Sequence, residues 1–131
     1  MAKKVSYVMA FVLGLGMIFL GARFFFSPEA ATMGFGIRIS SFDNYDFQHI
    51  KGIRDIFSGV LLCSFVLLNQ KKAVGIVLLT GTIIPVNDLL IVLSKPYNGM
   101  AWALPHIIAS LICFVFGLTL LLSKSRLHAQ S

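Results

Sequence analysis

The sequence predicts an all-α integral membrane protein, a four-helix up-down bundle with a long outer loop between its first and second helices. Of its 131 residues, 57% are hydrophobic and only 12% are charged, and the mean hydropathy is +0.88. Four apolar runs are each long enough to cross about 30 Å of hydrocarbon. They cover residues 5–26, 50–68, 73–93 and 101–122. We therefore expect a single domain over residues 1–131.

The first run follows Lys3 and Lys4, as the apolar part of a signal peptide would. It is longer than the apolar part of a typical signal peptide and continues through the phenylalanines at 24–26. We expect it to be the first membrane span and not a cleaved leader.

The connection over residues 27–48 is too long for a simple turn. Ser27, Pro28 and Glu29 are typical of a helix start, and Gly34 and Gly36 of its end, so a short helix is expected over about residues 28–33. Residues 37–42 alternate weakly in polarity. This loop is expected to be either a lid over a site or an amphipathic segment on the membrane surface.

The other two connections, residues 69–72 and 94–99, are short, which indicates antiparallel neighbours. Pro85 lies inside the third run. Its ring has no N–H to donate and crowds the carbonyl of Gly81, so this helix is expected to bend or open one turn before Asp88.

The net charge of +6 reflects membrane topology. By the positive-inside rule, both termini should be cytoplasmic, in a plasma or bacterial inner membrane. We expect membrane lipid and no nucleic acid as a partner; a homo-oligomer or a larger membrane complex stays open. The basic residues without acidic neighbours are at the N-terminus, the second connection and the C-terminus: Lys3, Lys4, Lys71, Lys72, Lys124 and Arg126.

Polar residues also occur inside the apolar runs, at one level. The rise of an α-helix puts most of them about 6–9 Å from the outer helix ends. Ionisable groups in membrane spans rarely face lipid and mark either a site or an ion-pair network. Small residues at helical spacing beside them indicate that they point into the bundle. The set is Arg23, Arg54, Asp55, Asn87, Asp88 and His106.

One function for this set is a pocket, for binding or catalysis, that takes a small amphipathic molecule. Arg54 or Arg23 would hold an anionic or carbonyl oxygen and Asp88 or Asp55 would act as acid or base. His106 would take part in catalysis and, with Asn87, position the molecule. The reaction would be proton transfer, isomerisation or cyclisation without a cofactor. No metal site is expected, because no His, Cys or carboxylate cluster has ligand spacing.

The alternative is a noncatalytic accessory or transporter-type subunit. Two arginines balance two aspartates in the set, so the charges could pair only to hold the helices in register. The sequence leaves both functions open, and with them the question of whether the protein is an enzyme.

Three stretches resemble a family of small four-span membrane proteins known as a domain of unknown function. They are KGIRDIFSG at residues 51–59, KKAVG at 71–75 and PVND at 85–88. The overall plan is also distantly similar to the DoxX-like membrane proteins. The resemblance implies the four-span architecture and no particular activity.

Overall fold

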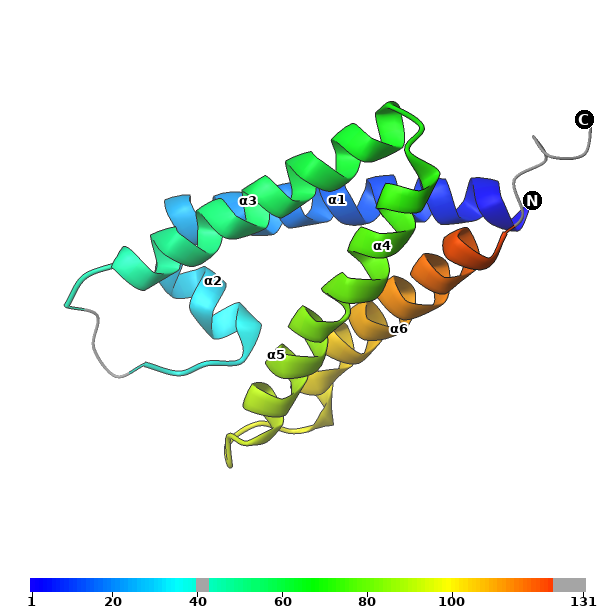
Figure 1. The fold of residues 1–131 in the computed structure, drawn as a ribbon. Helices are drawn as coiled ribbons and strands as arrows, with labels where there is room; N and C mark the ends of the chain where they lie inside the picture. The colour runs from blue at the N-terminus through cyan, green and yellow to red at the C-terminus, as the bar shows by residue number, and fades with distance from the viewer. Residues whose placement is uncertain (40–42, 124–131) are drawn as a thin grey trace, which may run out of the picture.

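Residues 1–39 and 43–123 are described by a computed structural model, and every regular element among them is an α-helix (Figure 1). Two basic residues of the predicted topology signal, Lys124 and Arg126, and part of the predicted surface segment, residues 40–42, lie outside the described residues. The helices are α1 (Ala2–Phe26), α2 (Pro28–Phe35), α3 (Asp46–Leu67), α4 (Lys71–Gly81), α5 (Ile83–Leu93) and α6 (Met100–Leu122).

Three helical stretches are long and apolar enough to cross a membrane: α1, the stretch Lys71–Leu93 formed by α4 and α5, and α6. Helix α3 has a similar length, but Asp46, Lys51, Arg54 and Asp55 make its first half less apolar. The helices agree with the four predicted runs. The largest difference is at the start of α3, which begins at Asp46 and not at residue 50.

The helices form two antiparallel pairs. Helix α1 packs chiefly against α3, and α6 runs along both α4 and α5. Figure 1 shows the two pairs close together near the N-terminus and diverging toward α2. We call the first end the closed end and the other the α2 end.

Glycines bring α1 and α3 into close contact. Gly21 of α1 lies against Gly52 of α3, and Gly14 lies against Gly59. A Cβ atom at Gly21 would stand only 2.5 Å from the Gly52 carbonyl oxygen. Small residues allow such backbone approach in membrane helices, as the sequence predicted for this face of α3.

The hydrophobic core lies toward the closed end, where the two pairs meet. Its members come from α1, α3, α4 and α6, so it joins one pair to the other. The buried residues of this core are Ala10, Leu62, Val74, Leu78, Cys113 and Leu120.

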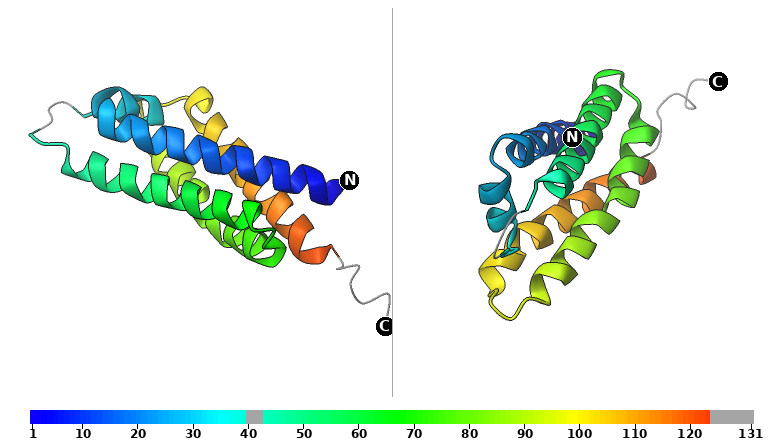
Figure 2. Two further views of the ribbon diagram at one scale, coloured as in Figure 1. Left: turned by 90° about the horizontal axis from the view of Figure 1, so that it is seen from above. Right: turned by 90° about the vertical axis from the view of Figure 1, so that its left-hand side faces the viewer.

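Helix α2 bridges the two pairs where they diverge (Figure 2). It starts at Pro28 as predicted, extends to Phe35, and ends at Gly36, whose φ of 101° is strained for residues with a side chain. The Asn98 side chain donates hydrogen bonds to the Gly36 oxygen at 2.8 Å and to the Val92 oxygen at 3.0 Å. These bonds fix the end of α2 to the turn between α5 and α6.

Arg38 and Tyr97 also connect the chain after α2 to the turn between α5 and α6. The Arg38 backbone N–H donates to the Tyr97 hydroxyl at 3.0 Å, and the Arg38 guanidinium lies 4.5 Å above the centre of the Tyr97 ring. The chain after α2 therefore rests on the α5–α6 turn.

The third predicted run is interrupted as Pro85 led us to expect. Helix α4 ends at Gly81 and α5 begins at Ile83. The Thr82 hydroxyl between them donates to the Leu78 oxygen at 3.1 Å. Around Gly81 the space is open, because a Cβ atom there would meet nothing within 4 Å.

Candidate functional site

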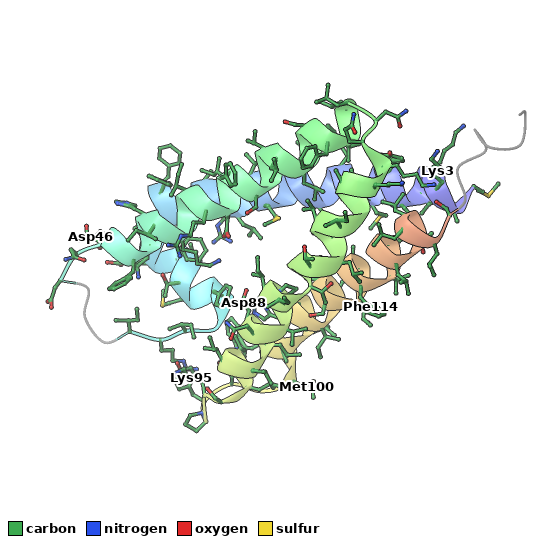
Figure 3. The ribbon with its side chains drawn as sticks, viewed as in Figure 1. Lys3, Asp46, Asp88, Lys95, Met100 and Phe114 are labelled. Carbon is green, nitrogen blue, oxygen red and sulfur yellow. The ribbon has the colours of Figure 1, made fainter. Side chains whose placement is uncertain are left out.

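A cavity of about 330 Å³ lies between the two helix pairs, and all six helices contribute to its walls. Figure 3 shows Asp88 where α5 approaches α2, on the side of the molecule where the pairs diverge. The cavity exists because the glycine contacts close each pair internally, while the two pairs meet through large side chains only toward the closed end.

The walls of the cavity change from apolar to polar along its length. Apolar side chains from four helices form the part toward the closed end, which we call the apolar end. Charged side chains gather in the part beside α2, which we call the polar end. The apolar residues include Leu13, Met17, Leu62, Val77 and Cys113, and the charged or titratable ones are Arg23, Lys51, Asp55, Asp88 and His106.

Lys51 lies at the centre of the polar end. Its Nζ is 2.9 Å from Oδ2 of Asp55, one helical turn further along α3. The same Nζ lies 5.1 Å from the centre of the Phe24 ring and 5.0 Å from that of Phe35. An ion pair and two aromatic faces therefore hold this ammonium group in place.

Phe35, at the end of α2, also contacts His106. The two rings pack edge to face with their centres 4.8 Å apart. The His106 Nε2 is 3.4 Å from the Phe35 carbonyl oxygen. Because a carbonyl can only accept, this contact requires the proton on Nε2, so in the neutral ring Nδ1 is the acceptor.

Arg23 and Asp88 are the two charged groups of the cavity without a direct partner. Among residues 1–39 and 43–123, neither has a hydrogen bond or an ion pair. The Asp88 carboxyl shares the cavity wall with Lys51, His106 and Asp55. The Arg23 guanidinium lies beside Gly34, about 4.0 Å from where a Cβ atom would be.

The structure brings four of the six predicted site residues to the cavity: Arg23, Asp55, Asp88 and His106. Arg54 and Asn87, which we expected among them, are exposed and do not line it. Neighbouring residues in an α-helix point about 100° apart, so Arg54 cannot share the direction of Asp55, nor Asn87 that of Asp88.

The charge pairing also differs from the expected one. We predicted two arginines opposite two aspartates, but Asp55 pairs with Lys51 within the same helix. This is the only ion pair in the described part of the chain.

Sequence reasoning missed three residues of the polar end: Lys51, Phe35 and Pro105. Lys51 lies at the start of the predicted run 50–68 but was not included in the polar set. Its spacing of four from Asp55 was the available signal. Pro105 carried a signal too, since it directly precedes His106 inside an apolar run.

Metal binding has no support in the described residues, since no group of three or more His, Cys, Asp or Glu could hold an ion there. The groups present are suited to hydrogen bonding and to proton transfer. Asp88 and His106 Nδ1 can accept a proton, and Arg23 can stabilise a developing negative charge.

The family model "Domain of unknown function (DUF4267)" matches residues 14–120. This match includes every residue of the polar end. No curated protein and no solved structure matches the chain.

Proposed function

The chain belongs to the uncharacterised DUF4267 family, and from its cavity we propose that it binds a small amphipathic molecule within the membrane. The observation that carries this proposal is the gradient of polarity along the cavity. Charged groups gather at one end on α1, α3, α5 and α6, and apolar side chains extend from each of them toward the other end. A molecule with a polar head and an apolar tail complements such walls.

The proposal includes a four-span bundle with both termini in the cytoplasm. In it, α3 is the fourth span despite the charges in its first half, because Lys51 and Asp55 face the cavity and each other. Lys3, Lys4, Lys71 and Lys72 then lie on the cytoplasmic side. The polar end of the cavity lies in the outer leaflet.

The size of the cavity supports a small ligand. Its volume of about 330 Å³ is at the lower limit of the roughly 300–1,000 Å³ of small-molecule sites. From Val77 to Asp88 its wall extends about 16 Å along the helix axis, at about 1.5 Å per residue. This is about half the thickness of the hydrocarbon core, so the molecule would enter from one leaflet.

The space between α3 and α5 is the natural entrance. These helices belong to different pairs and have little contact with each other, although both contribute to the cavity wall. A molecule in the outer leaflet would enter sideways between them, its polar head moving toward α2.

Acid–base chemistry on the bound molecule is a further part of the proposal. Asp88 and His106 would exchange a proton with the ligand, and Arg23 would hold the oxygen on which charge develops. The structural-clasp alternative has less support, because the observed ion pair joins Lys51 to Asp55 of its own helix and so connects no two helices.

Blocking the cavity at Gly81 tests the proposal. A leucine there would extend into open space at the cavity wall, so Gly81→Leu should fill the apolar part without a backbone clash. Gly16→Leu is the matched control, since Gly16 also has open space around it but does not line the cavity.

The measurement is saturable binding of radiolabelled decanoylglycerol to the protein in lipid nanodiscs. We expect Gly81→Leu to abolish saturable binding and Gly16→Leu to retain it. Equal binding by both variants, or no saturable binding by the unmodified protein to this or related single-chain amphiphiles, would contradict the proposal.

A further inference from the structure

The charged groups of the cavity define the head group of its ligand more narrowly than amphipathic character alone. Building on the proposed binding function, we infer that the ligand is an uncharged single-chain amphiphile whose head carries both an acceptor oxygen and a hydroxyl. A monoacylglycerol is an example of this class. The inference rests on charge balance and on two unpartnered side chains.

The first step is the charge balance of the cavity. Two cations, Arg23 and Lys51, face two carboxylates, Asp55 and Asp88. His106 leaves this balance unchanged when its ring is the neutral imidazole with the proton on Nε2. In surroundings of low dielectric constant an unbalanced charge is expensive, so a charged head group would introduce the imbalance that the four side chains avoid.

The second step concerns which of these groups are available. Lys51 and Asp55 already contact each other at 2.9 Å, and two aromatic rings cover the ammonium group. Arg23 and Asp88 have no such partner in residues 1–39 and 43–123. They are therefore the groups that a ligand would satisfy.

Arg23 and Asp88 require hydrogen-bonding partners of opposite kinds. A guanidinium only donates, so Arg23 requires an acceptor such as an ester carbonyl. An ionised carboxylate only accepts, so Asp88 requires a donor such as a hydroxyl. Arg23 is on α1 and Asp88 on α5, which belong to different helix pairs. A head group with both functions can connect the two walls.

His106 offers room for a second hydroxyl. Its Nε2 contacts the Phe35 oxygen, which leaves Nδ1 of the neutral ring as an acceptor, and His106 lines the same cavity as Asp88. The apolar end holds one chain, because a volume of about 330 Å³ is small even for a site of this type.

Four ligands with the same chain test the inference. Decanoylglycerol has the acceptor and the hydroxyls, and methyl decanoate has the acceptor without a hydroxyl. Decyl sulfate is a permanent anion and decyltrimethylammonium a permanent cation. We expect decanoylglycerol to bind about tenfold or more tightly than each of the others, since each leaves a charged group unpartnered.

Single charge removals provide the second part of the test. Asp88→Asn gives the cavity a surplus positive charge and should shift its preference toward decyl sulfate. Arg23→Gln gives it a surplus negative charge and should shift the preference toward decyltrimethylammonium. Arg54→Gln and Asn87→Ala are matched controls one residue from the cavity face, and both should retain the original order. Circular dichroism shows which variants remain folded.

The outcomes separate the two proposals. If all four ligands bind saturably and decyl sulfate or methyl decanoate equals decanoylglycerol, the head-group inference is wrong while the binding function stands. The same holds if Arg23→Gln and Arg54→Gln change the order alike. If no ligand binds saturably, the binding function itself is refuted.

Discussion

Replacing Gly21 by alanine tests how closely α1 and α3 pack. The added Cβ atom would lie 2.5 Å from the Gly52 oxygen and 2.7 Å from Cγ1 of Ile56. Carbon and oxygen atoms normally stay about 3.3 Å apart, so the helices would have to separate by about 0.8 Å. Such overpacking costs about 1–3 kcal/mol, against a gain of about 0.5–1 kcal/mol for alanine in a helix. We expect a net loss of about 1–2 kcal/mol in the free energy of unfolding.

Gly16→Ala is the control in the same helix. Nothing lies within 4 Å of its added Cβ atom, so only the helical gain of about 0.5–1 kcal/mol should remain. Both variants would be unfolded with sodium dodecyl sulfate in mild-detergent micelles and followed by far-ultraviolet circular dichroism. If Gly21→Ala were as stable as Gly16→Ala, the glycine contact between α1 and α3 would be refuted.

Three further predictions concern the polar end and the connection above it. Lys51→Met should lower the free energy of unfolding by about 1–2 kcal/mol, and the double variant with Asp55→Leu should lower it less, because no unpaired carboxylate remains; equal losses in the detergent unfolding assay would contradict this. The hydrogen bond to Glu29 raises the pKa of Tyr45. The stability that this bond contributes should therefore be complete below the ordinary tyrosine pKa and be lost as the pH rises through the raised pKa. Absorbance titration, in a variant whose other tyrosines are Phe, should show Glu29→Gln lowering the pKa of Tyr45; an unchanged pKa would count against the bond. Asn98→Ala should speed amide exchange at the end of α2 about tenfold, since two hydrogen bonds are lost, and unchanged exchange would show that they do not fix this segment.

Much of the fold could be predicted from the sequence, because lipid and helix geometry leave few alternatives. Four apolar runs predicted the long helices, and Ser27, Pro28 and Gly36 predicted the short helix α2. Pro85 gave the interruption at Gly81, since its effect is local. The divergence of the two helix pairs could not be predicted in this way. It depends on which side chains meet between the pairs, and periodicity carries no such information.

The sequence predicted the level of the polar residues along the helices, but only partly the direction in which their side chains point. Rise per residue placed the polar groups at one level, and four of them do line the cavity. We expected Arg54 and Asn87 to point into the bundle, but both are exposed. Each is adjacent to an aspartate that lines the cavity, and two adjacent residues of a helix cannot share one direction. Lys51 was missed because it stood at the very edge of the predicted run 50–68, whereas α3 begins at Asp46 and Lys51 lies more than one turn inside the helix.

The attachment of α2 has a consequence for binding. Glycine contacts make α1 and α3 one rigid pair, whereas the two pairs meet through the core only toward the closed end. The distance between the pairs at the polar end is therefore set by α2, which continues from α1 and is fixed to the α5–α6 turn by Asn98. Phe35 occupies this bridge and contacts Lys51 and His106 at once. If a ligand enters between α3 and α5 as proposed, it would have to work against this bridge, so we expect residues of α2, and not only the charged groups beneath it, to affect its affinity.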